Sequence, residues 1–218
     1  MARNPFAPAF ESLPPSLAIF PLTGVLLLPN GNLPLNIFEP RYLRMVEDAL
    51  ASPHRMIGMI QPRPGAGPGV PVYDVGCAGK ITEFSETGDG RYLITLTGVC
   101  RFQVARELDV TTLYRQVETN WTPYRGDMDS LTALDVDRVH LVGLLRTYFT
   151  EHGMDCDWSA IENAPDGKLI TCLSMICPFE PKEKQALLEA PCCKSRAETF
   201  MAMLEMAVRG SGSGASQH

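Results

Sequence analysis

Apolar residues in the first half of the chain fall into short segments separated by glycine, proline, asparagine and aspartate. Segments of this kind, rich in β-branched and aromatic residues, are typical of β-strands. The pattern predicts strands within six segments, at residues 17–28, 31–38, 55–62, 75–88, 91–108 and 113–121. Residues 86–91, ETGDGR, contain an Asp-Gly pair that favours a hairpin turn. Gly76 and Gly79 are expected where the backbone bends or another segment approaches closely.

One amphipathic segment interrupts these strands. A helix is predicted for residues 41–51, with five residues on its apolar face: Tyr42, Met45, Val46, Ala49 and Leu50. Pro40 suits the first helical position, and Glu39 lies near the positive end of the helix dipole. Arg41 and Arg44 are expected to face solvent or to pair with acidic neighbours. The polar residues of this segment are a ligand site or the joint between a strand and a helix, and the sequence favours the joint.

From about residue 130 the apolar residues recur at helical spacing. This spacing predicts helices at residues 131–150, 167–177, 181–189 and 193–209. Pro181 suits the first position of its helix, Asp166 is a candidate N-cap, and SAIE at 159–162 fits a capping box. Because strands and helices are segregated along the chain, the sequence predicts an α+β fold.

The predicted organisation has four parts. They are an N-terminal arm at 1–16, a strand-rich subdomain at 17–126, a helical subdomain at 127–209 and a flexible Gly/Ser tail at 210–218. Within the second part, the Pro/Gly-rich segment 61–71 can form neither a helix nor a β-ladder. We predict that it is a surface connection; the alternative is a mobile lip beside a binding groove.

Composition and charge narrow the class of protein. The 218 residues are 45% hydrophobic and carry a net charge of −6, which argues against nucleic acid as the main partner. The seven cysteines are irregularly spaced and follow no secretion signal, and no apolar run is long enough to span a bilayer. We therefore expect a cytoplasmic protein with reduced thiols and no membrane partner.

The chemical motifs do not predict an enzyme. GCAGK at 76–80 has the wrong spacing for a phosphate loop, and the chain contains neither C-x-x-C nor a G-x-S-x-G elbow. Pairs of aspartates near helix starts are explained by the helix dipole. We expect no catalytic residue, no metal ligand and no bound cofactor.

A possible nucleic-acid platform lies in GRYLITLTGVCRF, where arginines flank aromatic residues. Arg91 and Arg101 stand beside Tyr92 and Phe102, and stacking platforms combine such residue types. The preferred interpretation is that the aromatic residues belong to the core and the arginines are solvated.

Three stretches resemble the Lon N-terminal (substrate-binding) domain family. They are LAIFPLTGVLLLPNGNLPLNIFEPRYLRMV at 17–46, VGCAGKITEFSETGDGRYLITLTGVCRFQV at 75–104 and LSMICPFEPKEKQALLEAPCCKSRAETFMAML at 173–204. The resemblance implies a PUA-like β-barrel of about six strands and one short helix, followed by a C-terminal helical bundle. It also implies polypeptide binding. The sequence contains no Walker motif and stops where an ATPase would begin, so the resemblance implies neither ATP hydrolysis nor proteolysis.

The leading functional hypothesis is a non-enzymatic module that binds unfolded or exposed apolar polypeptide segments. Its groove would lie between barrel and bundle and would use flexible methionines, namely Met56, Met59, Met201, Met203 and Met206. The alternative is that these methionines fill gaps in the core. Two other functions remain open, a PUA-like RNA-binding module and an adaptor that docks onto a protease or chaperone.

Overall fold

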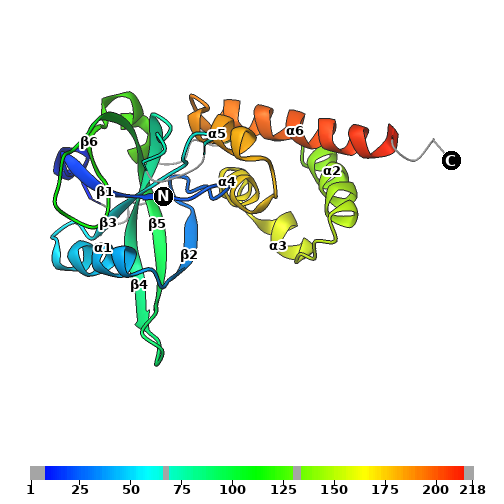
Figure 1. The fold of residues 1–218 in the computed structure, drawn as a ribbon. Helices are drawn as coiled ribbons and strands as arrows, with labels where there is room; N and C mark the ends of the chain where they lie inside the picture. Colours follow the sequence, from blue (N-terminus) through cyan, green and yellow to red (C-terminus); the bar gives the residue numbers. More distant parts are fainter. Residues whose placement is uncertain (1–7, 66–68, 130–133, 214–218) are drawn as a thin grey trace.

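The computed structural model describes residues 8–65, 69–129 and 134–213. Within these residues six strands form one sheet: β1 (Ser16–Pro21), β2 (Asn32–Ile37), β3 (Met56–Ile60), β4 (Val75–Glu86), β5 (Tyr92–Glu107) and β6 (Gln116–Asn120). Each lies within a segment predicted to contain a strand, apart from Ser16 at the start of β1. The sheet and the helices after it confirm the predicted α+β class (Figure 1).

The strands pair in the order β2-β5-β4-β3-β1-β6, and β6 also pairs with β5. The β1–β3 pair is parallel and the other ladders are antiparallel. Hydrogen-bonded neighbours therefore lead from β5 through β4, β3, β1 and β6 back to β5. All residues of β3 are buried, because Ile57 and Met59 pack in one hydrophobic cluster and Met56 and Ile60 pack in another.

Close packing inside the sheet explains two of its glycines. A Cβ atom on Gly76 would lie 2.6 Å from the Phe102 ring, and one on Gly79 would lie 2.7 Å from the Leu27 side chain. The expectation of close approach at both glycines is thus confirmed. The predicted hairpin is also present, with Gly90 at a φ of +80° in the turn between β4 and β5. The β4–β5 hairpin projects away from the rest of the sheet (Figure 1).

Helix α1 (Pro40–Ala51) follows β2 and packs on the sheet as its apolar face predicts. Pro40 occupies the first turn, while Tyr42 is buried with its ring centroid 4.2 Å from that of Phe20. Arg41 pairs with Glu39 at 2.8 Å, and Arg44 pairs with Asp48 one helical turn away. The arginines therefore pair with acidic neighbours, as expected.

The helical region contains α2 (Arg138–Glu151), α3 (Trp158–Asn163), α4 (Asp166–Ile176), α5 (Pro181–Glu189) and α6 (Cys193–Ser213). Helix α6 runs along the other helices (Figure 1). It continues to Ser213, so the predicted end at 209 is wrong, and the remainder of the predicted tail, 214–218, lies outside the described residues. Helix α2 starts at Arg138, later than predicted, and residues 130–133 are not described.

The predicted helix caps differ in two places. The carboxylate of Asp157 accepts hydrogen bonds from the backbone N–H groups of Ser159 and Ala160, so Asp157 caps α3 and the capping box predicted at 159–162 is wrong. Asp166 is the first residue of α4 rather than its cap. An aspartate side chain readily accepts hydrogen bonds from the free N–H groups of the first turn. Asp157 can do so because it lies directly before the first residue of α3.

Buried polar contacts join the sheet to the helices. Arg101 of β5 is only 3% exposed; its guanidinium binds Asp127 at 2.7 Å and donates to the carbonyl oxygens of Leu188 and Ala190 at the end of α5. The prediction that Arg101 is solvated is therefore wrong, because the carboxylate and these carbonyls replace its water. Burial lowers the pKa of Arg101, but the hydrogen bonds and charge of Asp127 outweigh it, and the net pKa is raised.

A second contact uses neutral amides. Gln61 donates to the carbonyl oxygen of Pro181 and to Gln185, and Gln185 donates to the carbonyl oxygen of Val75. One hydrophobic cluster also extends from the sheet into the helices, including Leu28 and Leu173. Together these contacts fix how the two regions meet.

No helix among the described residues is long and apolar enough to cross a membrane.

Candidate functional site

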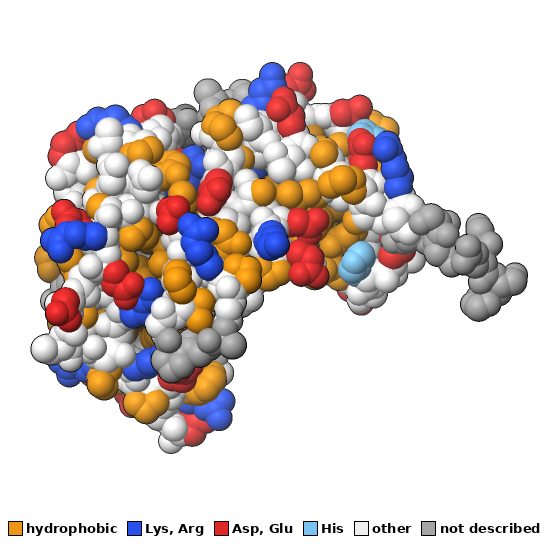
Figure 2. Space-filling model, turned by 45° about the horizontal axis from the view of Figure 1, so that its top comes forward, with side chains coloured by type: hydrophobic (Ala, Val, Ile, Leu, Met, Phe, Trp, Pro, Cys, Tyr) orange, Lys and Arg blue, Asp and Glu red, His pale blue; other side chains and the backbone are white. Residues whose placement is uncertain are grey.

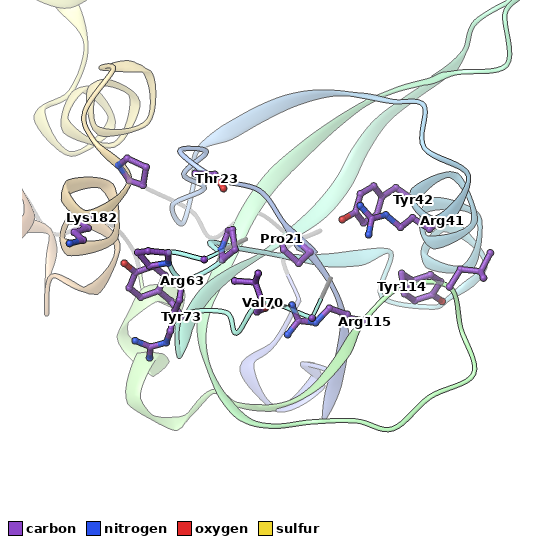
Figure 3. Close-up of a pocket in the computed structure, with 16 residues that line it drawn as sticks. Pro21, Thr23, Arg41, Tyr42, Arg63, Val70, Tyr73, Tyr114, Arg115 and Lys182 are labelled. Atoms are coloured by element: carbon purple, nitrogen blue, oxygen red, sulfur yellow. Dashed lines mark hydrogen bonds between the residues drawn. The ribbon is translucent and has the colours of Figure 1, made fainter. Parts of the chain in front are cut away.

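A cavity of about 480 Å³ opens beside the start of α1 (Figure 3). Five chain segments form it: the end of β1, the first turn of α1, the Pro/Gly-rich segment with Tyr73, the residues before β6, and the start of α5. Its lining residues are Pro21, Thr23, Arg41, Tyr42, Pro62, Arg63, Pro64, Gly65, Gly69, Val70, Tyr73, Leu113, Tyr114, Arg115, Pro181 and Lys182. We call it the α1 cavity.

The Pro/Gly-rich segment 61–71 supplies six of these lining residues. The chain passes through Pro62, which bridges to Val72, and residues 66–68 lie outside the described residues. The segment is thus a connection that also borders the α1 cavity.

Four cationic side chains line the α1 cavity: Arg41, Arg63, Arg115 and Lys182. No carboxylate occurs among its described lining residues. In Figure 3, Arg63, Tyr73 and Lys182 lie on one side and Arg41, Tyr42 and Tyr114 on the other. Arg115 and Val70 lie between them, so cations surround the opening rather than cluster at one edge.

Aromatic rings and carboxylates orient three of these cations. The guanidinium of Arg41 lies 4.4 Å from the Tyr42 ring centroid, and that of Arg63 lies 5.1 Å from the Tyr73 ring centroid. Glu107 binds Arg115 through both carboxylate oxygens, each at 2.6 Å. Such pairs hold planar cations in fixed orientations.

Two tyrosine side chains remain neutral in this cavity. Burial raises the pKa of Tyr42, whose ring packs against Arg41. Burial and a 2.8 Å hydrogen bond donated to Asp48 raise the pKa of Tyr114 to about 12. Neither phenol therefore adds negative charge to the lining of the cavity.

The five methionines predicted to bind polypeptide occupy different environments. Met56, Met59 and Met203 are buried, Met201 is partly exposed, and Met206 is 62% exposed. Met56 and Met59 are buried because β3 is covered on both faces, and Met203 packs in the core of the helical region. The α1 cavity has none of the five among its lining residues.

Other hollows differ in chemistry. One of about 380 Å³ lies among α2, α3 and α4, and its lining is mainly apolar, including Phe149, Ile161 and Ile176. Another, of about 260 Å³, lies where the two regions meet and contains both Arg196 and Asp127. Neither combines several cations with several tyrosines.

Groups able to carry chemistry are mostly engaged in packing. Burial raises the pKa of Cys177 to about 12 and that of Cys100 to about 12, so both thiols stay protonated and pack as small apolar groups. His140 pairs with Glu205, and the His152 ring stacks on Tyr148. Among the described residues, no group of three or more His, Cys, Asp or Glu side chains is placed to hold a metal ion.

Sequence reasoning missed the cations of the α1 cavity. They are dispersed from Arg41 to Lys182, so no local motif brings them together. The available signal was the Pro/Gly-rich segment, because long irregular loops often border binding sites.

The chain is similar to part of several curated Lon proteases. Lon protease 2 of Sorangium cellulosum is 31% identical over 109 residues, which cover 47% of this chain and 13% of that protein. Lon protease of Anaeromyxobacter dehalogenans is 28% identical over 100 residues, which cover 43% of this chain and 11% of that protein. The chain thus matches only a small part of these curated relatives.

Two solved structures share the fold over most of the chain. A Lon N-terminal domain protein from Xanthomonas campestris has a TM-score of 0.59 and 24% identity, covering 86% of this chain and 97% of that one. The N-terminal domain of a Mycobacterium avium complex Lon protease has a TM-score of 0.60 and 15% identity, covering 87% and 98%. The family model of the ATP-dependent protease La (LON) substrate-binding domain matches residues 16–206, and the chain belongs to this family.

Proposed function

We propose that this chain is a non-catalytic module that binds unfolded or exposed polypeptide segments, with the α1 cavity as its principal site. The observation that carries the proposal is the lining of this cavity. Prolines, Tyr73, Val70 and Leu113 supply apolar surface, and charged groups surround it. Aromatic-lined grooves suit extended chains, since rings and prolines pack against side chains without requiring one sequence.

Family membership supports the same function, since the matching family model describes a substrate-binding domain of a protease. Leu113 adds a specific observation, because its side chain is 70% exposed at the rim of the cavity. An exposed leucine beside tyrosines offers apolar surface to a partner. Among the five methionines of the original hypothesis, Met206 is the most exposed and remains the candidate for contact with a polypeptide.

The RNA-binding alternative receives less support from the cavity. Three of its four cations pair with Glu39, Asp74 and Glu107, which leaves one net positive charge among these seven groups. A polyphosphate backbone needs a larger excess of cations. Docking onto a protease or chaperone is compatible with polypeptide binding, because such a partner would be recognised through an exposed segment.

Titration with a permanently unfolded protein tests the proposal. A reduced and alkylated model protein is added to the isotope-labelled chain, and amide chemical shifts are followed by NMR. We expect shifts at residues that line the α1 cavity and weaker binding by Leu113→Ser. The folded, unmodified form of the same model protein is the control. An absence of shifts at millimolar concentrations of the unfolded protein would contradict the proposal.

A further inference from the structure

The α1 cavity differs in charge from the molecule that contains it. The chain has 25 acidic and 19 basic residues, and Figure 2 shows Asp and Glu side chains interspersed with Lys and Arg over one face. The lining of the cavity nevertheless contains four cations and no carboxylate among its described residues. Such a local excess in an acidic protein marks where an anionic group would be attracted.

Hydrogen-bond donors remain available in this lining. Arg41 uses Nε and Nη2 on Glu39, and Arg63 uses Nε on the Val72 carbonyl oxygen and Nη2 on Asp74. Nη1 of each arginine has no hydrogen-bond partner among the described residues. These two donors are therefore free to meet a carboxylate on an incoming chain.

Lys182 is the cation with the greatest freedom. It is exposed at the second position of α5, and its ammonium group makes no hydrogen bond or ion pair within the described part of the chain. In Figure 3 it lies on the same side of the cavity as Arg63 and Tyr73. An exposed lysine without a partner exchanges water for a ligand carboxylate at little cost in existing contacts.

The apolar part of the lining limits the kind of anion. Pro21, Val70 and Leu113 contact the same space as the cations, which suits a ligand with carbon-rich side chains beside its charge. The small net charge of the site matches one or two carboxylates better than a run of phosphates. An extended polypeptide containing acidic residues next to aromatic residues or proline meets both conditions.

We propose that the α1 cavity selects polypeptide segments that carry Asp or Glu beside aromatic residues or proline. One carboxylate contacts Lys182 and the free nitrogen of Arg63, and a second contacts that of Arg41 on the opposite side of the cavity. The neighbouring ring or proline packs on the partly exposed Tyr73 and on Leu113. This inference rests on the proposed polypeptide binding and adds a charge preference to it.

The test compares two short fluorescein-labelled peptides that differ only in charge. One contains Asp-Tyr-Pro-Asp and the other Asn-Tyr-Pro-Asn, and binding is measured by fluorescence anisotropy at low ionic strength. We expect the acidic peptide to bind about tenfold more tightly, since hydrogen bonds to charged groups are the stronger ones. Added sodium chloride should reduce this difference.

A matched pair of variants assigns the preference to the cavity. Lys182→Glu should remove most of the difference between the peptides, and it is compatible with folding because a carboxylate is favourable in the first turn of a helix. Lys168→Glu is the control, as Lys168 is also exposed but lies at the apolar hollow of the helical region. Circular dichroism of both variants checks their folding.

The possible results distinguish a failure of the charge preference from a failure of polypeptide binding itself. Equal affinity for both peptides would overturn the charge preference and leave polypeptide binding intact. If neither peptide nor the unfolded model protein binds, the proposed function itself fails. Tighter binding of a single-stranded oligonucleotide than of the acidic peptide, abolished by Lys182→Glu, would reassign the cavity to nucleic acid and overturn the inference. Equal effects of the two lysine variants would also contradict it.

Discussion

Two hollows of several hundred cubic ångströms differ in chemistry: one is formed mainly by the sheet region with the start of α5, and the other lies within the helical region. The α1 cavity is lined by four cations and three tyrosines, whereas the helical hollow is mainly apolar, with Lys168 and Asp157 as its charged residues. The first forms where helix starts and loops meet, so polar side chains border it. The second forms between helix faces, where small residues such as Ala160 and Ala164 leave space. Location in the fold therefore explains the character of each hollow.

The two regions also differ in how they are stabilised. Backbone ladders hold the sheet, and close approaches such as that of Gly76 to Phe102 leave no spare volume. Side-chain packing holds the helices, and some of their positions, such as Gly143, face open space. Between the regions lies the Arg101–Asp127 pair. Substitutions in either region, or at the contact between them, test this difference.

The largest effect is expected from Arg101→Met, which removes the charged contact between the regions. It leaves Asp127 buried without its partner, and breaking a buried pair from one side costs about 3–5 kcal/mol. Urea unfolding followed by fluorescence measures the loss. The chain has two tryptophans, Trp121 beside β6 and Trp158 in α3. When one tryptophan is replaced by phenylalanine, the fluorescence of the remaining one reports on its own region. We expect the helical region to unfold at lower urea concentration than the sheet region.

Arg91→Met is the control for this variant, because the exposed Arg91 pairs with Asp89 in the hairpin and should contribute less than about 1 kcal/mol. Adding Asp127→Leu to Arg101→Met should restore part of the stability, since the unpaired charge is then removed. Equal losses from the two arginine variants would show that Arg101 does not join the regions.

Gly76→Ala tests the tight packing of the sheet. Its Cβ would lie 2.6 Å from Phe102 and 2.7 Å from the Met59 carbonyl oxygen, and overpacking of this kind costs about 1–3 kcal/mol. The free energy of unfolding is measured in urea. In a Phe102→Leu background, which removes the ring, Gly76→Ala should cost less stability than it does in the unmodified chain. An unchanged cost in that background would mean that backbone contact with Met59 dominates.

Gly143→Ala tests the open packing of the helical region and should have the opposite sign. Gly143 lies within α2, and a Cβ there would meet nothing within 4 Å. Alanine loses less backbone entropy on folding, so a gain of about 0.5–1 kcal/mol is expected. Thermal unfolding measures the gain, and a loss of stability would show that α2 has a close neighbour at this face.

The smallest effect concerns pH at the α1 cavity. The folded-state pKa of Tyr114 is raised from 10.0 to about 12, so folding favours its protonated form. The resulting stabilisation is present below pH 10 and is lost as pH rises from 10 towards 12. The melting temperature of Tyr114→Phe should therefore fall less over this range than that of the unmodified chain. Tyr73→Phe is the control, and identical alkaline profiles for all three proteins would contradict the assignment.

Much of the fold was predictable because local patterns and tertiary packing agree. Apolar alternation located the strands, Asp89-Gly90 located the hairpin, and Pro40 and Pro181 marked helix starts. The errors arose where neighbouring residues competed. Asp157 caps α3 in place of Ser159, and α6 continues through residues whose glycine and serine content favours a flexible chain. Such boundaries depend on a few hydrogen bonds, and amino-acid composition does not show which of the competing hydrogen bonds forms.

The sequence by itself determined the α+β class, most elements, the acidic balance and a resemblance to one family, because each depends on residues near one another in the chain. Only the tertiary structure decided which residues meet. Folding buried Arg101 against Asp127, placed Met56 and Met59 in a strand whose residues are all buried, and assembled Arg41, Arg63 and Lys182 around one cavity. The physical reason is that charge and apolar surface act through space, and separation along the chain does not fix distance in the folded molecule.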